Sequence, residues 1–309
     1  MMERLVRQSK FRKDRSAFTS TRTMRIVRRI ARGVVEMLPL VTTIGRSRQA
    51  ERKHIQEMQR IRDEYLSLMV SCLTGTIYED PPLKVLGQDR YDATLREYGW
   101  DWPSQAHTMV GTRRLNNLRL LIEDVIANDV PGDLIETGVW RGGACILMRA
   151  VLYAHGIENR RVWIADSFEG LPRPDVTRYP ADEHDKFYTY QDLAVSMDEV
   201  KHNFEKYGLL DNQLVFLNGW FKDTLPTAPI DSLAILRLDG DMYESTILAL
   251  RNLYERLSIG GYVIVDDYHV VQGCKMAIDE FIAKKGLTPE VKEIDGVGVY
   301  WQKTEKDAL

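Results

Sequence analysis

The stretch DLIETGVWRGGAC, residues 133–145, indicates the fold of this chain of 309 residues. Leu134, Ile135 and Thr137 belong to a short run typical of a β-strand, the three glycines allow a tight turn, and residues 144–154 favour an apolar helix. Such an arrangement brings backbone amides close to a small ligand. The stretch therefore predicts a strand, turn and helix that bind a cofactor in an enzyme.

Strand and helix signals alternate from this stretch to the C-terminus. Buried apolar strands that alternate with helices are typical of an α/β fold with a doubly wound, mostly parallel sheet. Residues 291–294 and 297–301 are close enough in sequence to form an antiparallel hairpin at one edge. The other expected strands are 133–137, 161–166, 213–217, 233–238 and 261–265, and the expected helices are 144–154, 197–207, 244–257 and 273–284.

The chain divides into three regions by composition and pattern. Residues 1–48 form a basic N-terminal extension, 49–106 a cap of helix and loops, and 107–309 the catalytic domain. Residues 1–60 hold 16 Lys and Arg but 5 Asp and Glu, a net charge of +11 in a chain whose net charge is −3. Such an arm suits a membrane surface, a nucleic acid or an acidic protein surface, and composition alone leaves these open. We expect a membrane surface or a partner protein, and no nucleic acid.

The composition favours a soluble, cytoplasmic protein. No stretch reaches the roughly 18 consecutive apolar residues of a membrane span. Cys72, Cys145 and Cys274 show no paired spacing, which is typical of a reducing compartment. The expected helix 49–73 carries an apolar stripe that indicates contact with the core or with a second subunit, and we expect a homo-oligomer.

Carboxylates close four of the expected strands: Glu136 the first, Asp166 the second, Asp239 the fourth, and Asp266 with Asp267 the fifth. In open α/β sheets, ligands bind outside the carboxyl ends of the strands. The first carboxylate suits a ligand ammonium group, and the second suits a ribose diol. S-adenosylmethionine has both groups, whereas a dinucleotide has only the ribose and favours a different glycine spacing. An NAD-dependent oxidoreductase on a similar sheet is the alternative.

The sequence resembles the macrocin O-methyltransferase (TylF-like) family of sugar O-methyltransferases from macrolide and related antibiotic pathways. The resemblance implies a Rossmann-like class I methyltransferase fold with an antiparallel final strand, S-adenosylmethionine and Mg²⁺ as cofactors, and a glycosylated natural product as the acceptor. It extends from about Arg62 to Lys303. It rests on VPGDLIETGVWRGGACILMRAVL from Val130, VWIADSFEGLP from Val162, NGWFKDTLPTAP from Asn218, LRLDGDMYEST from Leu236 and GGYVIVDDY from Gly260.

The resemblance also implies a set of cofactor contacts. The residues at the first strand end and its turn would surround the methionine part, those after the second strand the ribose and adenine, and those after the third strand the adenine ring. Two residues before the first strand would close over the cofactor, and Asp239 would border it. In chain order the set is Thr108, Met109, Glu136, Thr137, Gly138, Trp140, Arg141, Asp166, Ser167, Phe168, Asn218, Gly219, Trp220 and Asp239.

Asp239, Asp266 and Asp267 predict a metal site. Neighbouring parallel strands lie about 5 Å apart, so these carboxylates can converge on one ion. A set of carboxylate oxygens selects a hard cation, and we expect magnesium. Three clustered anions without a cation would repel one another. In the alternative, the aspartates of LDGD cap the helix that begins near Glu244, and Asp266 and Asp267 merely end a strand.

A cation explains how an alcohol is methylated near neutral pH, because it stabilises the alkoxide and lowers the pKa of the hydroxyl. The oxygen then attacks the sulfonium methyl group in line. We assign Asp239 as both a metal ligand and the general base, and Asp266 and Asp267 as ligands.

The segment 172–196 is too long and polar for an ordinary connector. Loops of this length beside a site often act as lids, although a plain surface loop is the alternative. Tyr179 and Tyr188 in this segment are candidates to stack on the acceptor, and Tyr78 is another candidate to border its pocket. His269 follows the acidic pair and is a candidate to face the acceptor. The alternatives are that it is exposed to solvent or that it contacts a metal ligand without touching the ion.

Overall fold

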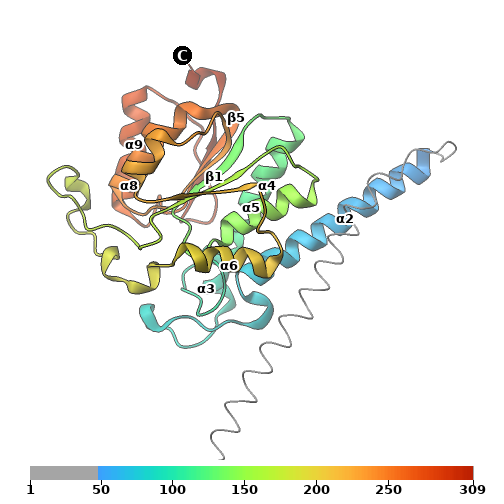
Figure 1. Cartoon of the computed structure of the whole chain (residues 1–309), viewed down its shortest axis with the longest axis horizontal. Coiled ribbons are helices and arrows are strands. Elements are labelled where there is room, and N and C mark those ends of the chain that lie inside the picture. Colours follow the sequence, from blue (N-terminus) through green and yellow to red (C-terminus); the bar gives the residue numbers. More distant parts are fainter. Residues whose placement is uncertain (1–47, 309) are drawn as a thin grey trace, which may run out of the picture.

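A computed structural model describes residues 48–308, which form a seven-stranded sheet covered by helices on both faces (Figure 1). The strand order is β3-β2-β1-β4-β5-β7-β6. Strands β1 to β5 run parallel, and β7 is antiparallel to both of its neighbours, β5 and β6. The prediction of a doubly wound, mostly parallel sheet with an antiparallel terminal hairpin is therefore confirmed.

Most elements agree with the sequence pattern, but the short helices 93–98 and 221–224 were not expected. The expected helix to residue 257 ends at Leu253, because Leu257 pairs with Leu233 and begins a longer fifth strand. The strands are β1 (Asp133–Thr137), β2 (Val162–Asp166), β3 (Leu214–Asn218), β4 (Leu233–Leu238), β5 (Leu257–Val265), β6 (Lys292–Glu293) and β7 (Val299–Gln302). The α-helices are α2 (Arg48–Leu73), α3 (Ala93–Tyr98), α4 (Thr112–Ala127), α5 (Gly143–Ala154), α6 (Met197–Tyr207), α7 (Phe221–Thr224), α8 (Tyr243–Leu253) and α9 (Gln272–Lys285).

Two hydrophobic cores lie on opposite faces of the sheet. Because successive strand residues point to opposite faces, Leu134 of β1 packs with α2, α4, α5 and α6, while Ile135 packs with α8 and α9. The same alternation separates Ile164 from Trp163 on β2. Strands buried on both faces read as continuous apolar runs, which is why the pattern predicted a parallel sheet.

The register of the parallel strands places their carboxyl ends at one edge of the sheet. Thr137 of β1 lies beside Leu238 of β4, and Leu238 lies beside Val265 of β5. The residues that directly follow β4 and β5 are therefore neighbours in space. This register assembles the site.

The N-terminal part of the described chain is held together by Arg96 of α3. Its guanidinium is completely buried and donates to both carboxylate oxygens of Asp101, with 2.6 Å between Nη2 and Oδ2. It also donates to the backbone oxygens of Thr74 and Asp80. One buried arginine thus joins the end of α2 to the loops that follow it. The division at residues 48 and 106 stays a prediction, and the predicted extension 1–48 falls outside the described residues except for Arg48.

Two other expectations concern cysteines and membranes. Cys145 and Cys274 are buried free thiols, and Cys72 is a half-buried free thiol. Among residues 48–308, no helix is both long and apolar enough to cross a bilayer.

The long segment 172–196 is anchored to the body of the protein. The backbone N–H groups of Tyr243 and Glu244 donate to the two oxygens of Asp182 at 2.7 and 2.9 Å, so Asp182 satisfies the start of α8. The alternative in which the LDGD aspartates cap this helix is wrong, because no side chain at its own N-terminus does so. The indole N–H of Trp140 fixes the other end of the segment by donating to the backbone oxygen of Asp192.

Replacing Asp182 by alanine removes this distant cap. We expect the free energy of unfolding to fall by about 1 kcal/mol, the usual cost of losing an N-terminal helix cap. Urea unfolding followed by circular dichroism measures the change. Glu183→Ala, an exposed neighbour, is the control. Equal stability of the two variants would show that Asp182 does not stabilise α8.

Candidate active site

A cavity of about 600 Å³ opens at the carboxyl ends of β1, β2, β4 and β5. Its walls come from the turn after β1, the segment after β2, the start of α7, and the loops after β4 and β5. The structure therefore brings together the strand ends that the sequence pattern singled out. The predicted residues on its wall are Met109, Gly138, Trp140, Asp166, Ser167, Trp220, Asp239, Asp266 and Asp267.

The turn after β1 lies directly against the loop after β4. Gly138 has a φ angle of 90°, and a Cβ atom there would overlap the backbone oxygen of Asp239. Only glycine fits this position. Asp166 joins the turn to β2, since its Oδ2 accepts from the N–H of Val139 at 2.7 Å and its Oδ1 from the N–H of Phe168 at 2.8 Å. Asp166 and the turn thus form one rigid wall.

The other predicted cofactor contacts lie behind or beside this wall. Arg141 donates to the backbone oxygens of Pro103 and Ala106, and Phe168 packs near Phe216. Glu136 and Thr137 are buried within the sheet. The predicted contacts that do not line the cavity are Thr108, Glu136, Thr137, Arg141, Phe168, Asn218 and Gly219, and their cofactor roles stay predictions.

Asp239, Asp266 and Asp267 converge on one point of the cavity wall. One carboxylate oxygen from each lies within 4.8 Å of the others. Asp266 is buried, whereas Asp239 and Asp267 are partly exposed. Oδ2 of Asp267 is buried and has no hydrogen-bond partner among the described residues. The convergence that the strand ends predicted is present.

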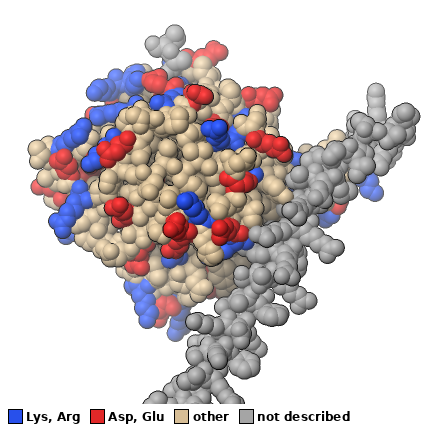
Figure 2. All heavy atoms as spheres, in the orientation of Figure 1, with Lys and Arg blue, Asp and Glu red and all other residues tan. Residues whose placement is uncertain are grey.

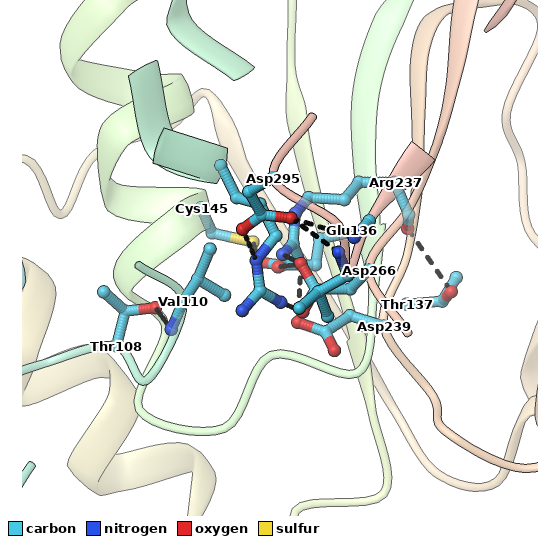
Figure 3. A network of polar contacts seen from close by, with 12 residues as sticks. Thr108, Val110, Glu136, Thr137, Cys145, Arg237, Asp239, Asp266 and Asp295 are labelled. Atoms are coloured by element: carbon cyan, nitrogen blue, oxygen red, sulfur yellow. Dashed lines mark hydrogen bonds and ion pairs between the residues drawn. The ribbon is translucent and has the colours of Figure 1, made fainter. Parts of the chain in front are cut away.

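Two buried arginines that the sequence pattern did not single out, Arg114 and Arg237, neutralise part of this acidic cluster, and Figure 3 shows Arg237 among the carboxylates. Arg237 of β4 forms ion pairs with Glu136, with Asp239 at 2.6 Å and with Asp266. Arg114 of α4 pairs with the other oxygen of Asp266. The repulsion expected among the three aspartates is therefore relieved in part by arginine side chains. An arginine inside the buried apolar run LAILRL was the available signal.

Burial and mutual repulsion raise the pKa values of the acidic groups. Burial is the main cause at Glu136, whose pKa is raised to about 7 despite its pairing with Arg237. Burial and the nearby Asp266 raise the pKa of Asp239 to about 6. The pKa values of Asp241 and Asp267 lie well above the ordinary range for the same two reasons. A positive ligand would therefore be stabilised at this end of the cavity.

None of the four predicted acceptor residues lines the cavity. Tyr179 is buried and packs near Tyr243, and the guanidinium of Arg173 lies over the ring of Tyr188. His269 faces Glu293, with 3.5 Å between Nε2 and Oε1. Tyr78 is half exposed outside the cavity wall. Their acceptor roles remain predictions. Other side chains form this part of the wall, notably Trp100, Trp102, Phe187, Leu193 and Val270.

Residues 52–303 match the family described as macrocin-O-methyltransferase (TylF). The chain belongs to the macrocin O-methyltransferase family. It is 55% identical over 244 residues to demethyldecarbamoylnovobiocin O-methyltransferase of Streptomyces niveus, a match that covers 78% of this chain and 93% of that protein. The family resemblance inferred from the sequence motifs is thereby confirmed.

Two further relatives agree with this membership. The chain is 52% identical over 249 residues to 8-demethyl-8-(2,3-dimethoxy-alpha-L-rhamnosyl)-tetracenomycin-C 4'-O-methyltransferase of Streptomyces olivaceus, covering 80% of this chain and 95% of that protein. The solved structure of the O-methyltransferase NovP superposes with a TM-score of 0.77 at 54% identity, covering 79% of this chain and 100% of that chain. This macrocin O-methyltransferase family member is an S-adenosylmethionine-dependent O-methyltransferase. None of these relatives is an oxidoreductase.

Glu136 gives the protein a distinctive pH dependence. Its folded-state pKa of about 7 lies above its ordinary value of 4.5. The stabilising contribution of its proton is therefore complete below about pH 4.5 and is lost as the pH rises through 7. We expect the stability of Glu136→Gln, relative to the original protein, to increase between pH 4.5 and 7 and then level off.

Urea unfolding at a series of pH values, with a chelator present, measures this difference. Glu183→Gln, which replaces an exposed glutamate by the same change, is the control. A pH dependence of Glu136→Gln no different from that of this control would contradict the raised pKa of Glu136.

Proposed function

We propose that this enzyme transfers a methyl group from S-adenosylmethionine to a sugar hydroxyl of a glycosylated natural product, and that a magnesium ion assists the transfer. The observation that carries the proposal is the convergence of three aspartates in the same cavity as the glycine turn after β1. Two relatives support the acceptor class. One is named for a novobiocin precursor and the other for a rhamnosyl tetracenomycin.

The cofactor fits the end of the cavity formed by the turn after β1 and the segment after β2. The rigid turn at Gly138 and Trp140 would bind the methionine part. Asp166 lines this end of the cavity, and its carboxylate, held in place by the N–H groups of Val139 and Phe168, would accept from the ribose hydroxyls. Trp220 offers an aromatic face for the adenine ring.

The acidic cluster has the properties of a magnesium site. Its donors are carboxylate oxygens, the ligands that hard cations prefer. The buried Asp267 oxygen without a partner is an unsatisfied acceptor that such a cation would satisfy. Asp239, Asp266 and Asp267 would hold the ion. When bound, the ion would supply electrostatic stabilisation of the acceptor oxygen as it loses its proton.

Asp239 is the proposed general base. Its side chain is partly exposed to the cavity, where an acceptor hydroxyl would lie within reach of its carboxylate. It takes the proton of the acceptor hydroxyl while the hydroxyl oxygen forms a bond to the methyl carbon. The bond between that carbon and sulfur breaks, and the electron pair stays on sulfur to give S-adenosylhomocysteine. The rigid walls keep the two reactants aligned.

We also propose that the enzyme is a homo-oligomer in which α2 contributes to the subunit contact. The C-terminal half of α2 packs on the core through Tyr65 and Met69, whereas its N-terminal half extends beyond the body (Figure 1). Ile55 in that half is 51% exposed. On the face seen in Figure 2, basic and acidic side chains are interspersed, so that face offers no large patch of one charge.

Asp239→Asn removes the proposed base and one proposed ligand. We expect methyl transfer to fall by roughly 10²- to 10⁴-fold, the usual contribution of a general base, while S-adenosylhomocysteine still binds. Transfer to demethyldecarbamoylnovobiocin measures the first effect, and calorimetry measures the second. A chelator should reduce transfer by the original enzyme, and added Mg²⁺ should restore it.

Asp175→Asn is the matched control, because Asp175 also lines the cavity but lies outside the acidic cluster. It should retain transfer. Full turnover by Asp239→Asn would reject the role of Asp239, and activity that survives exhaustive chelation would reject the magnesium ion.

Ile55→Lys tests the proposed subunit contact. We expect the variant to have a smaller mass than the original chain in light scattering at equal concentration, because a charge replaces an exposed apolar group on α2. Lys53→Ala, at another position on the same helix, is the control. A monomeric original chain would contradict the proposed oligomer, and an unchanged mass for Ile55→Lys would exclude this part of α2.

A further inference from the structure

Arg114 connects three segments that are distant in the sequence. It lies near the start of α4, is 6% exposed and borders the cavity. Its Nη1 pairs with Asp266 after β5, and its Nε donates to Oδ2 of Asp295 at 3.0 Å in the turn before β7. Its Nη2 donates to the backbone oxygen of Tyr98 at 3.0 Å. A guanidinium carries five N–H donors in a fixed planar fork, so that one side chain can donate to three well-separated partners.

The carboxylate of Asp266 is clamped between two arginines. Arg237 holds its Oδ1 and Arg114 holds its Oδ2. Hydrogen bonds between charged partners are strong and directional, particularly where water is excluded. The clamp therefore sets the plane of Asp266 relative to the neighbouring carboxylates of Asp239 and Asp267.

The other anchors of Arg114 are themselves fixed. Oδ1 of Asp295 accepts from the N–H groups of Val297 and Gly298 at 3.0 and 3.1 Å. At the Tyr98 anchor, Gly99 has a φ angle of 67°, and a Cβ atom there would lie only 2.6 Å from the backbone nitrogen of Gly111. Arg114 is consequently held from two rigid turns while it contacts Asp266.

We propose that Arg114 is a positioning residue, which orients Asp266 so that the acidic cluster can accept a divalent cation. This inference rests on the proposed function, since it concerns the proposed magnesium site. It assigns Arg114 a task that is carried out through Asp266. It also gives Asp295, which lies outside the cavity wall, a task in fixing that arginine.

Arg114→Lys tests the orientation rather than the charge. Lysine keeps the positive charge but has one compact ammonium group, which cannot reach Asp266, Asp295 and Tyr98 together. We expect the affinity for Mg²⁺ alone, measured by calorimetry at fixed pH, to fall roughly tenfold or more, as for the loss of a charged hydrogen bond. The affinity for S-adenosylhomocysteine should stay unchanged.

Arg113→Lys is the matched control. Arg113 is the neighbouring residue on α4, is exposed, and pairs with Glu97 at 2.7 Å without touching the cluster. Its replacement should leave Mg²⁺ affinity unchanged. Asp295→Asn is the second test and serves if Arg114→Lys does not fold. Its amide oxygen can still accept from the N–H groups of Val297 and Gly298, but its amide nitrogen would face Nε of Arg114, and both of these groups are donors. We therefore expect Asp295→Asn to weaken Mg²⁺ binding as well.

The outcomes separate this inference from the proposed function. If the original protein binds Mg²⁺ and folded Arg114→Lys and Asp295→Asn bind it equally well, Arg114 has only a structural role and the inference is overturned. If the original protein does not bind Mg²⁺ at all, the ion is removed from the proposed function and the positioning role falls with it. Weaker binding by the Arg114 and Asp295 variants, with Arg113→Lys unaffected, supports both.

Discussion

The pairing of Arg237 with three carboxylates is the interaction on which the site depends. Arg237 belongs to β4, and its guanidinium contacts Glu136, Asp239 and Asp266. Glu136 belongs to β1, and the two aspartates directly follow β4 and β5. Without it, these buried acids would repel one another across the centre of the sheet. A buried charge is tolerated only when it is paired and hydrogen-bonded, and here the pairing links the fold directly to the site.

The acidic cluster keeps negative character even after this pairing. Within residues 48–308, Arg114 and Arg237 form ion pairs with the cluster, and two positive charges neutralise only part of the charge of three carboxylates. The pKa values of Asp239, Asp241 and Asp267 remain raised. The cavity combines this acidic end with tryptophan and phenylalanine side chains elsewhere on its wall, and this lining is consistent with the glycosylated acceptor that we propose.

The strands and the convergence of Asp239 with Asp266 and Asp267 could be predicted, because both follow from short-range pattern and from the parallel register. The side chains that would contact the acceptor could not be predicted in this way. Tyr179 and Tyr188 had suitable side chains, but packing turned the first into the core and placed the second beside Arg173. Which face of a loop meets a cavity depends on contacts with distant elements, and those leave no periodic signal.

The sequence by itself determined the alternation of strands and helices, the glycine turn after β1 and the acids at the strand ends, since each of these features depends on residues that are close together in the chain. Only the tertiary structure decided how the charges are balanced. Arg114 and Asp266 are far apart in the chain, as are Asp182 and the start of α8 that it caps. Such partners are chosen by the packing of whole elements, because a buried charge or an open helix end pairs with whatever the fold brings within hydrogen-bonding distance.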